Sequence, residues 1–164
     1  TMEELMGEKE HPLFLVLEDL QDPGNMGTIF RTAEGAGVDG IFMSANCVDI
    51  YNPKTIRSTM GSIYRVPFVI APDLQEVFAW FKKQRVRSYA AHLKGKGWYD
   101  EQSYVGGTAF LIGNEGNGLT DATAGQADCL IRIPMEGQLE SLNAGVAAAI
   151  LMYEASRQRR KEYK

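Results

Sequence analysis

The chain has 164 residues, which suits one domain, and 45% of them are hydrophobic, enough for a substantial core. The net charge is −4, so the chain lacks the overall positive charge that is usual in a nucleic-acid-binding domain. No run approaches the roughly 20 apolar residues of a membrane span, and the first residues contain no apolar signal-peptide core. We therefore expect a single globular domain in the cytoplasm.

The residues that could bind a metal are few. Cys47 and Cys129 have no metal-like spacing, and His11 and His92 lie too far apart for a histidine site. We expect reduced thiols and no metal. Charge is unevenly distributed, because residues 157–164 carry +4, which leaves −8 on the remainder.

Six apolar runs of strand length alternate with segments of helical spacing. The runs cover residues 13–17, 40–44, 66–71, 86–92, 108–112 and 129–133. After the first, Asp22-Pro23-Gly24 supplies a turn before a helix that we expect Asn25 to cap and Gly35 and Gly37 to end. This strand, helix, strand order predicts a parallel sheet with right-handed crossovers.

Four further helices are predicted after the second strand. Asn52 and Asp73 are expected to cap two of them, a short one covers residues 119–127, and the last runs from about 141 to 160. Its packed stripe is expected to consist of Leu142, Val146, Ile150 and Tyr153. Residues 94–99 are expected to form a loop with basic and aromatic residues.

Two turns follow the last two predicted strands. They are Gly113–Gly118 (GNEGNG) and Pro134–Gln138 (PMEGQ), and Ser141-Leu142-Asn143 opens the last helix, with Ser141 as its expected cap. Glycine allows close backbone approach to a ligand, and loops at the carboxyl ends of parallel strands form the sites of α/β proteins. The sequence therefore predicts a pocket built from two loops and a helix start.

Three motifs together resemble the SpoU/TrmH family of RNA ribose methyltransferases, part of the SPOUT superfamily. They are NMGTIFR from Asn25, GNEGNGL from Gly113, and IPM with SLNAGVAAAILMYE from Ile133 and Ser141. The resemblance implies a parallel-sheet α/β/α sandwich with a C-terminal trefoil knot over residues 13–164. Residues 1–12 are then expected to form a linker, which in two-domain relatives follows a small RNA-binding domain.

The resemblance also implies the residues of the site. The catalytic residues would be Asn25, Arg31, Glu115, Ser141 and Asn143. S-adenosyl-L-methionine would be bound by Ala91, His92, Leu111, Ile112, Gly113, Asn114, Gly116, Ile133, Pro134, Met135, Ser141, Leu142 and Asn143. RNA would be contacted by Arg31, Lys54, Arg57 and Arg65.

The chemistry of these side chains limits their roles. Arginine is a poor general base because its pKa exceeds about 12, so Arg31 is expected to clamp the substrate phosphate or the 2′-oxygen. Glu115 is expected to orient the ribose hydroxyl or Arg31. Valine at Gly113 or Gly116 is expected to abolish donor binding, because it disfavours positive φ and fills the donor's space.

The resemblance thus implies an S-adenosylmethionine-dependent RNA 2′-O-ribose methyltransferase that needs no metal. Ribosomal RNA is the first candidate substrate, because YNPKTIRSTMGSIYRVP from Tyr51 resembles ribosomal RNA enzymes of the family. Transfer RNA, a non-catalytic RNA-binding module and a dinucleotide-binding protein are the alternatives.

The family resemblance further implies a homodimer. Nearly every residue from 144 to 153 is small or apolar, so the last helix needs cover on more than one side. The cations of residues 157–164 complement the helix dipole, or alternatively contact RNA together with Lys94 and Lys96.

Overall fold

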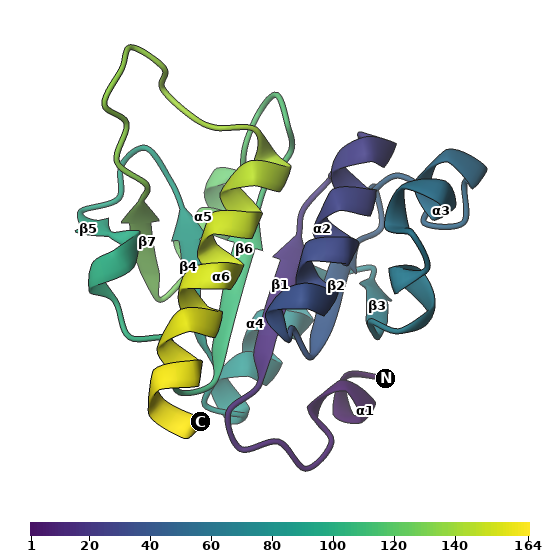
Figure 1. The fold of residues 1–164 in the computed structure, drawn as a ribbon, viewed down its shortest axis with the longest axis horizontal. Coiled ribbons are helices and arrows are strands. Elements are labelled where there is room, and N and C mark those ends of the chain that lie inside the picture. Colours follow the sequence, from purple (N-terminus) through teal and green to yellow (C-terminus); the bar gives the residue numbers. More distant parts are fainter.

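The computed structural model describes all residues, 1–164, and contains one seven-stranded sheet (Figure 1). The strands are β1 (Leu13–Leu17), β2 (Gly40–Ser44), β3 (Phe68–Ala71), β4 (Arg87–Ala91), β5 (Gly97–Trp98), β6 (Thr108–Ile112) and β7 (Cys129–Arg132). They lie in the order β3-β2-β1-β6-β4-β7-β5, and every neighbouring pair is parallel. The predicted parallel sheet is therefore confirmed.

Helices cover both faces of this sheet. They are α1 (Met2–Met6), α2 (Pro23–Ala36), α3 (Pro53–Thr59), α4 (Leu74–Lys83), α5 (Asp121–Gln126) and α6 (Ala144–Tyr163), with short 3₁₀ turns at Ser62–Tyr64 and Tyr99–Glu101. Figure 1 shows α2 and α6 in front of the sheet and α4 behind it. The predicted α/β/α sandwich is confirmed, whereas strand order alone does not test the knot, which stays a prediction. No helix is both long and apolar enough to cross a membrane.

The central strands are buried on both faces because their side chains alternate between two cores. In β1, Leu13, Leu15 and Leu17 belong to the core under α2 and α6, whereas Phe14 and Val16 belong to the core under α4. All five residues of β1 are buried. This two-sided burial explains why the strands are continuous apolar runs rather than alternating patterns.

The first predicted helix start is wrong by three residues. Asp22, not Asn25, is the N-cap: its carboxylate accepts from the Asn25 N–H at 3.0 Å, and Pro23 occupies the first helical position. Proline fits that position because its missing N–H would have no intrahelical partner there. Gly37 ends α2 in the left-handed conformation, as predicted, but Gly35 lies inside the helix.

The start and the packed face of α6 also differ from prediction. Asn143 is the N-cap, accepting from the N–H groups of Gly145 at 2.8 Å and Val146 at 3.2 Å. Serine and asparagine cap helices about equally well, so SLN did not reveal which one acts. The predicted stripe is wrong as well. Its members are exposed or half-buried, and the buried residues are Gly145, Ala148, Leu151, Met152 and Ala155.

Small residues set this packing because α2 and α6 approach closely. A Cβ on Gly35 would lie 2.7 Å from the Tyr153 hydroxyl oxygen, and one on Gly145 would lie 3.3 Å from Oδ1 of Asn25. Gly35 therefore lies inside α2, where the absence of a side chain allows α6 to pack closely, and it does not end the helix. Leu151 and Met152 of α6 are buried in the core, whereas Val146 and Tyr153 are 48% and 47% exposed.

Three predicted strands (66–71, 86–92 and 129–133) are shorter than expected, and one strand was missed. The N–H groups of Val66 and Val86 bond back to Ser62 and Phe81, so both residues close the preceding turn instead of joining the sheet. The expected loop of residues 94–99 contains β5, which is too short to leave a periodic signal. In the expected linker, α1 packs Leu5 into the core under α4.

Arg159 fastens the end of α6 to the segments that precede β1 and β6. Its guanidinium donates to the carbonyl oxygens of Tyr104 (2.9 Å), His11 (2.7 Å), Pro12 (3.3 Å) and Gly106 (2.7 Å). Burial lowers the pKa of Arg159. One of the cations of residues 157–164 thus has a structural role.

Replacing Arg159 by Met should lower the free energy of unfolding by about 2–4 kcal/mol, because it leaves several half-buried carbonyl groups without a donor. Urea denaturation measures this. Arg160→Met is the matched control, because Arg160 is exposed and donates to Ser156. Equal stability of the two variants would contradict the structural role of Arg159.

Candidate functional site

A cavity of about 350 Å³ lies at the carboxyl ends of β4, β6 and β7. Its walls come from the ends of these strands, the loops that follow them and the start of α6. The lining residues are Ala91, His92, Leu93, Leu111, Ile112, Gly113, Asn114, Glu115, Gly116, Asn117, Gly118, Leu119, Arg132, Ile133, Met135, Glu140, Ser141, Leu142, Ala144 and Ala147. The volume and the half-apolar lining suit a small organic ligand.

The loop after β6 is held by its own hydrogen bonds. Asn114 and Gly118 exchange backbone hydrogen bonds of 3.1 and 2.8 Å, and Oδ1 of Asn114 accepts from the N–H groups of Gly116 and Asn117. Gly118 has a φ of 69°, which favours glycine. The loop therefore keeps its shape without help from a ligand.

The steric reason given above for the two loop glycines needs correction. Neither Gly113 nor Gly116 has a positive φ. A Cβ on Gly113 would lie 2.2 Å from backbone atoms of Gly118 and Leu119, so it would disrupt the loop itself. A Cβ on Gly116 would meet only Oδ1 of Asn114, at 3.5 Å, which is an ordinary contact.

Hydrogen bonds join this loop to the segment that follows β1. The Glu115 carboxylate accepts from the N–H groups of Gln21 (3.0 Å) and Asp22 (2.7 Å), and Nδ2 of Asn114 donates to the Asp19 carbonyl oxygen at 2.7 Å. Asp19 has a φ of 53°, and its N–H donates to Ser44 at 2.7 Å. Loops separated by more than 90 residues in sequence thus form one wall beside the cavity.

Glu18 makes a second connection that sequence reasoning missed. Its carboxylate is buried and accepts from the Thr120 N–H at 2.8 Å and from the hydroxyls of Thr120 and Thr123. Thr120 is also the N-cap of α5. A charged residue directly after an apolar strand was the available signal, because a buried carboxylate needs donors.

The surroundings of Glu115 keep it ionised. Partial burial raises the pKa of its carboxyl, but the backbone donors at Gln21 and Asp22 outweigh this, and a contact with Asn25 contributes, so the net pKa is lowered. No ion pair joins Glu115 to Arg31 within the chain. The carboxylate therefore supports the loops and is a weak proton acceptor.

The structure brings most of the predicted catalytic residues to one place. Asn25 and Asn143 both approach Gly145, with Oδ1 atoms 3.3 and 3.2 Å from where its Cβ would lie, and Glu115 lies beside Asn25. Ser141 lines the cavity. Arg31 does not: it is exposed on α2, outside the cavity.

The residues predicted to bind the methyl donor line the cavity with two exceptions, Pro134 and Asn143. Pro134 is exposed, and the side chain of Asn143 is engaged in capping α6. The lining also includes residues that were not among the predicted site residues, namely Leu93, Asn117, Gly118, Leu119, Arg132, Glu140, Ala144 and Ala147. Most of these adjoin a predicted residue, so only the extent of each loop was missed.

The predicted RNA-binding cations fall into two groups. Arg31, Lys54 and Arg57 are exposed and make no ion pair. Arg65 forms a bidentate ion pair with Glu34 and thereby lowers the pKa of that carboxyl to about 2. Arg65 is therefore less available to a phosphate than the other three.

Comparison with known proteins identifies the family. Residues 12–153 match the model of the SpoU rRNA Methylase family, and the chain belongs to this family. It is 38% identical over 139 residues to the 23S rRNA (guanosine(2553)-2'-O)-methyltransferase RlmP of Bacillus subtilis, covering 85% of this chain and 56% of the relative. It is 34% identical over 166 residues to the tRNA (guanosine(18)-2'-O)-methyltransferase of Thermus thermophilus, covering 98% and 82%.

A solved structure agrees with this relationship. The SpoU methyltransferase AviRb from Streptomyces viridochromogenes, in complex with AdoMet, superposes with a TM-score of 0.91 at 32% identity, covering 98% of this chain and 65% of that one. The chain spans a little more than half the length of several curated relatives.

Glu115→Gln should loosen the connection between the two loops, because an amide nitrogen would then face a backbone N–H. The expected loss of stability is about 1 kcal/mol for this exposed group, with faster amide exchange at Gln21 and Asp22. Hydrogen exchange followed by NMR measures this. Glu140→Gln, on the cavity rim, is the control, and unchanged exchange in Glu115→Gln would contradict the connection.

Proposed function

We propose that the chain is the catalytic domain of an S-adenosylmethionine-dependent RNA 2′-O-ribose methyltransferase. The observation that carries this proposal is the cavity, which most of the residues predicted to bind the donor line at the carboxyl ends of β4, β6 and β7. Relatives named as 2′-O-methyltransferases support the reaction, and a neighbouring structure that contains AdoMet supports the cofactor.

The cavity fits such a cofactor. Its volume of about 350 Å³ lies within the range of small-molecule sites, and the rim loop is satisfied by internal hydrogen bonds, so the pocket is preformed. S-adenosylmethionine would be held by the residues that line the cavity, from Ala91 to Ala147. When bound, it supplies an activated methyl group, so the protein needs only to hold the acceptor hydroxyl in line with it.

The chain's own polar groups suggest how the acceptor is held. Asn25 lies at the first turn of α2 and faces the start of α6, so its amide is placed to position a ribose hydroxyl beside Ser141. Arg31 lies further along α2, where its guanidinium stabilises negative charge on the acceptor oxygen or binds the adjoining phosphate. Glu115 supports the loops rather than accepting the proton.

Ribosomal RNA is the substrate that we propose, with transfer RNA as the alternative. RlmP, named for 23S rRNA, is 38% identical, whereas the transfer RNA enzyme is 34% identical but matches over more of its length. We also propose the cytoplasm as the compartment.

The direct test is methyl transfer from labelled S-adenosylmethionine to total RNA, which is then separated into ribosomal and transfer fractions and digested to nucleosides. Labelled 2′-O-methyl nucleosides are expected in the ribosomal fraction. Label in transfer RNA alone would select the alternative substrate. The absence of labelled ribose in both fractions, with donor bound, would favour a non-catalytic RNA-binding module.

Replacing each of the two loop glycines by alanine should show whether donor binding depends on the conformation of the loop. Gly113→Ala is expected to abolish donor binding because its Cβ would lie 2.2 Å from backbone atoms. In Gly116→Ala the added Cβ makes only an ordinary contact, so the variant's affinity for the donor should stay within a few-fold of the wild-type value. Titration calorimetry with S-adenosylmethionine measures both, and equal affinities would place the donor away from this loop.

Arg31→Ala should lower turnover by about 10²–10³-fold while leaving donor affinity within a few-fold, because Arg31 lies outside the cavity. Single-turnover methyl transfer and calorimetry separate the two effects. Arg87→Ala, at the start of β4, is the control for loss of an exposed arginine. Wild-type turnover in Arg31→Ala would remove the proposed role.

We also propose a homodimer whose interface includes the outer faces of α2 and α6. The exposed apolar side chains of α6 support it, because Val146 and Tyr153 lie exposed on the same helix as the half-buried Ile150. Sedimentation equilibrium at micromolar concentration should give twice the mass of 18.2 kDa. Val146→Glu should shift the protein toward the monomer, and a wild-type monomer with full activity would exclude the dimer.

A further inference from the structure

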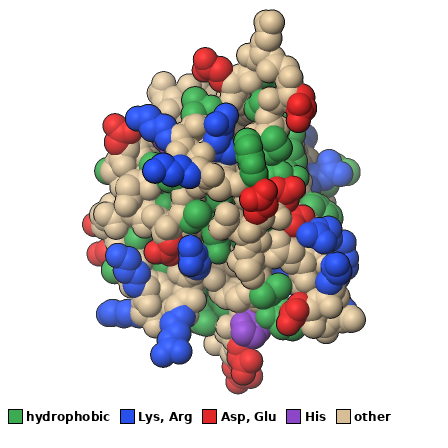
Figure 2. Space-filling model, turned by 90° about the vertical axis from the view of Figure 1, so that its left-hand side faces the viewer, with side chains coloured by type: hydrophobic (Ala, Val, Ile, Leu, Met, Phe, Trp, Pro, Cys, Tyr) green, Lys and Arg blue, Asp and Glu red, His purple; other side chains and the backbone are tan.

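One edge of the sheet continues the rim of the cavity as a basic surface. Arg132 lines the cavity at the end of β7, and β5 pairs with β7 through Trp98 and Arg132. The chain reaches β5 through Lys94 and Lys96, which are both exposed. We call Lys94, Lys96, Trp98 and Arg132 the basic edge. Figure 2 views the molecule from the side on which β5 and β7 lie, and Lys and Arg side chains are spread over that face.

No cation of the basic edge takes part in an ion pair, although the exposed Asp100 and Glu101 follow Trp98 in the chain. Elsewhere, Lys9 pairs with Asp39 at 3.1 Å, Arg65 with Glu34 and Arg157 with Glu154. None of the ion pairs involves a residue of the basic edge. In a chain with a net charge of −4, unpaired cations gathered beside the cavity form a local site for a polyanion.

The backbone of this edge is fixed in place. The His92 N–H donates to the Ile131 carbonyl oxygen, and the Gly95 N–H donates to the His92 carbonyl oxygen, both at 2.9 Å. A Cβ on Gly95 would lie 2.6 Å from the Ile131 carbonyl carbon, so only glycine allows this close packing. The two lysines on either side of Gly95 are thus presented by a backbone that is tied to β7.

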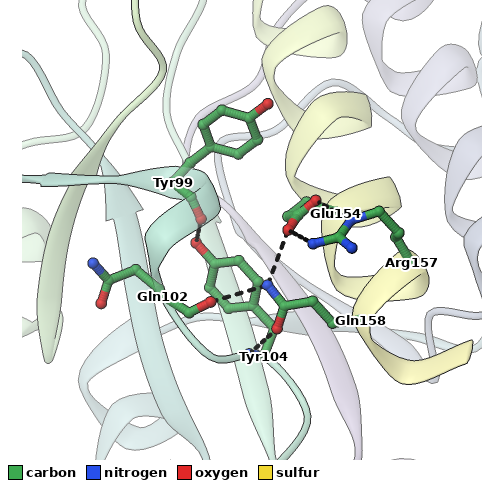
Figure 3. Close-up of polar contacts among 6 residues, drawn as sticks. All are labelled: Tyr99, Gln102, Tyr104, Glu154, Arg157 and Gln158. Carbon is green, nitrogen blue, oxygen red and sulfur yellow. Dashed lines mark hydrogen bonds and ion pairs between the residues drawn. The ribbon is translucent and has the colours of Figure 1, made fainter. Parts of the chain in front are cut away.

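A network from α6 holds the far end of the same segment (Figure 3). Gln158 donates to the Gln102 carbonyl oxygen at 2.9 Å and accepts from the Tyr104 N–H at 2.7 Å. The buried Tyr104 hydroxyl donates to the Tyr99 carbonyl oxygen at 2.5 Å. Tyr99 directly follows Trp98, so this network fixes the strand that carries the indole.

Trp98 adds an aromatic surface to the cations. The Arg132 guanidinium carbon lies 5.8 Å from the centre of the Trp98 ring, and Trp98 remains 40% exposed. Aromatic rings beside unpaired cations in a fixed backbone are how proteins bind single-stranded nucleic acid, because bases stack on the rings while cations contact phosphates.

From this arrangement we infer that the basic edge binds the single-stranded RNA that flanks the methylated nucleotide. Lys94 and Lys96 contact backbone phosphates, and a base next to the target stacks on Trp98. The inference rests on the proposed function for its choice of RNA, and it adds a surface to the cations of α2 and α3. It also assigns an RNA-binding role to basic and aromatic residues of positions 94–99.

The test measures the binding of a labelled mixed-sequence single-stranded RNA of about 12 nucleotides by fluorescence anisotropy at several salt concentrations. Lys94→Ala/Lys96→Ala should weaken binding and lower the slope of log affinity against log salt by about 1.4, because each lost phosphate contact removes about 0.7. Lys82→Ala/Lys83→Ala is the matched control, because these exposed lysines lie on α4 and make no ion pair.

Trp98→Ala should weaken binding by about 5- to 150-fold with little change in the salt slope, because stacking does not release counterions. Calorimetry with S-adenosylmethionine should give wild-type affinity for the lysine variants, which shows that the cavity is intact. It also separates a loss of RNA binding from a loss of donor binding.

The outcomes separate this inference from the proposed function. If the lysine and tryptophan variants bind RNA as the wild type does while methyl transfer is intact, the inference is overturned and the function stands. If the variants lose RNA affinity although the wild type transfers no methyl group, the basic edge is supported and the function is not. A wild type that binds no RNA overturns the inference outright.

Discussion

The side chains that join the segment after β1 to the loop after β6 are the constraint on which the rest of the site depends. Glu115 and Asn114 bind the backbone of residues 19–22, and Glu18 binds the start of α5. Each bond contributes only about 0.5–1.5 kcal/mol, but together they determine where two helices begin and where one wall of the cavity lies. Because β1 and β6 are neighbours in the sheet, these contacts need no long reach.

A second constraint is the close approach of α2 and α6, which brings their first turns to the same place. Gly145 lies against the Asn25 side chain, and Gly35 lies against the Tyr153 hydroxyl, so a glycine on each helix leaves room for a side chain of the other. Leu151 and Met152 of α6 remain in the core, whereas Val146 and Tyr153 are exposed. The helix that shapes the pocket would then also supply a partner's surface, which links the proposed dimer to the proposed site.

Much of the fold could be predicted because the strands are short apolar runs between clear turns. The bounds of β1, β2 and β6 were predicted from the sequence, whereas β5 has two residues and leaves no pattern. Helix starts were less certain, because SLN contains two good caps and Asp22 competes with Asn25. The packed face of α6 was missed because nearly every residue from 144 to 153 is small or apolar, so helical spacing fits more than one face; the buried face is Gly145, Ala148, Leu151, Met152 and Ala155.

The position of the site could be predicted from the sequence, but the hydrogen bonds that hold its loops together could not. Three motifs indicated which loops form the cavity, since their order along the chain matched the family. The sequence did not show that Glu115 holds backbone N–H groups, because such contacts join residues that are far apart in sequence. For the same reason Glu18 and Arg159 appeared only as a strand end and a tail cation.

The central claim is that this domain places a ribose hydroxyl beside a methyl donor held in the cavity between β4, β6 and β7. The measurement that tests it most directly is mass-spectrometric mapping of ribose 2′-O-methyl groups in RNA from cells with and without the gene. The account predicts that at least one such group disappears from ribosomal RNA and returns with the wild-type gene but not with Arg31→Ala. An unchanged set of 2′-O-methyl groups in all RNA of the deletion strain would contradict it.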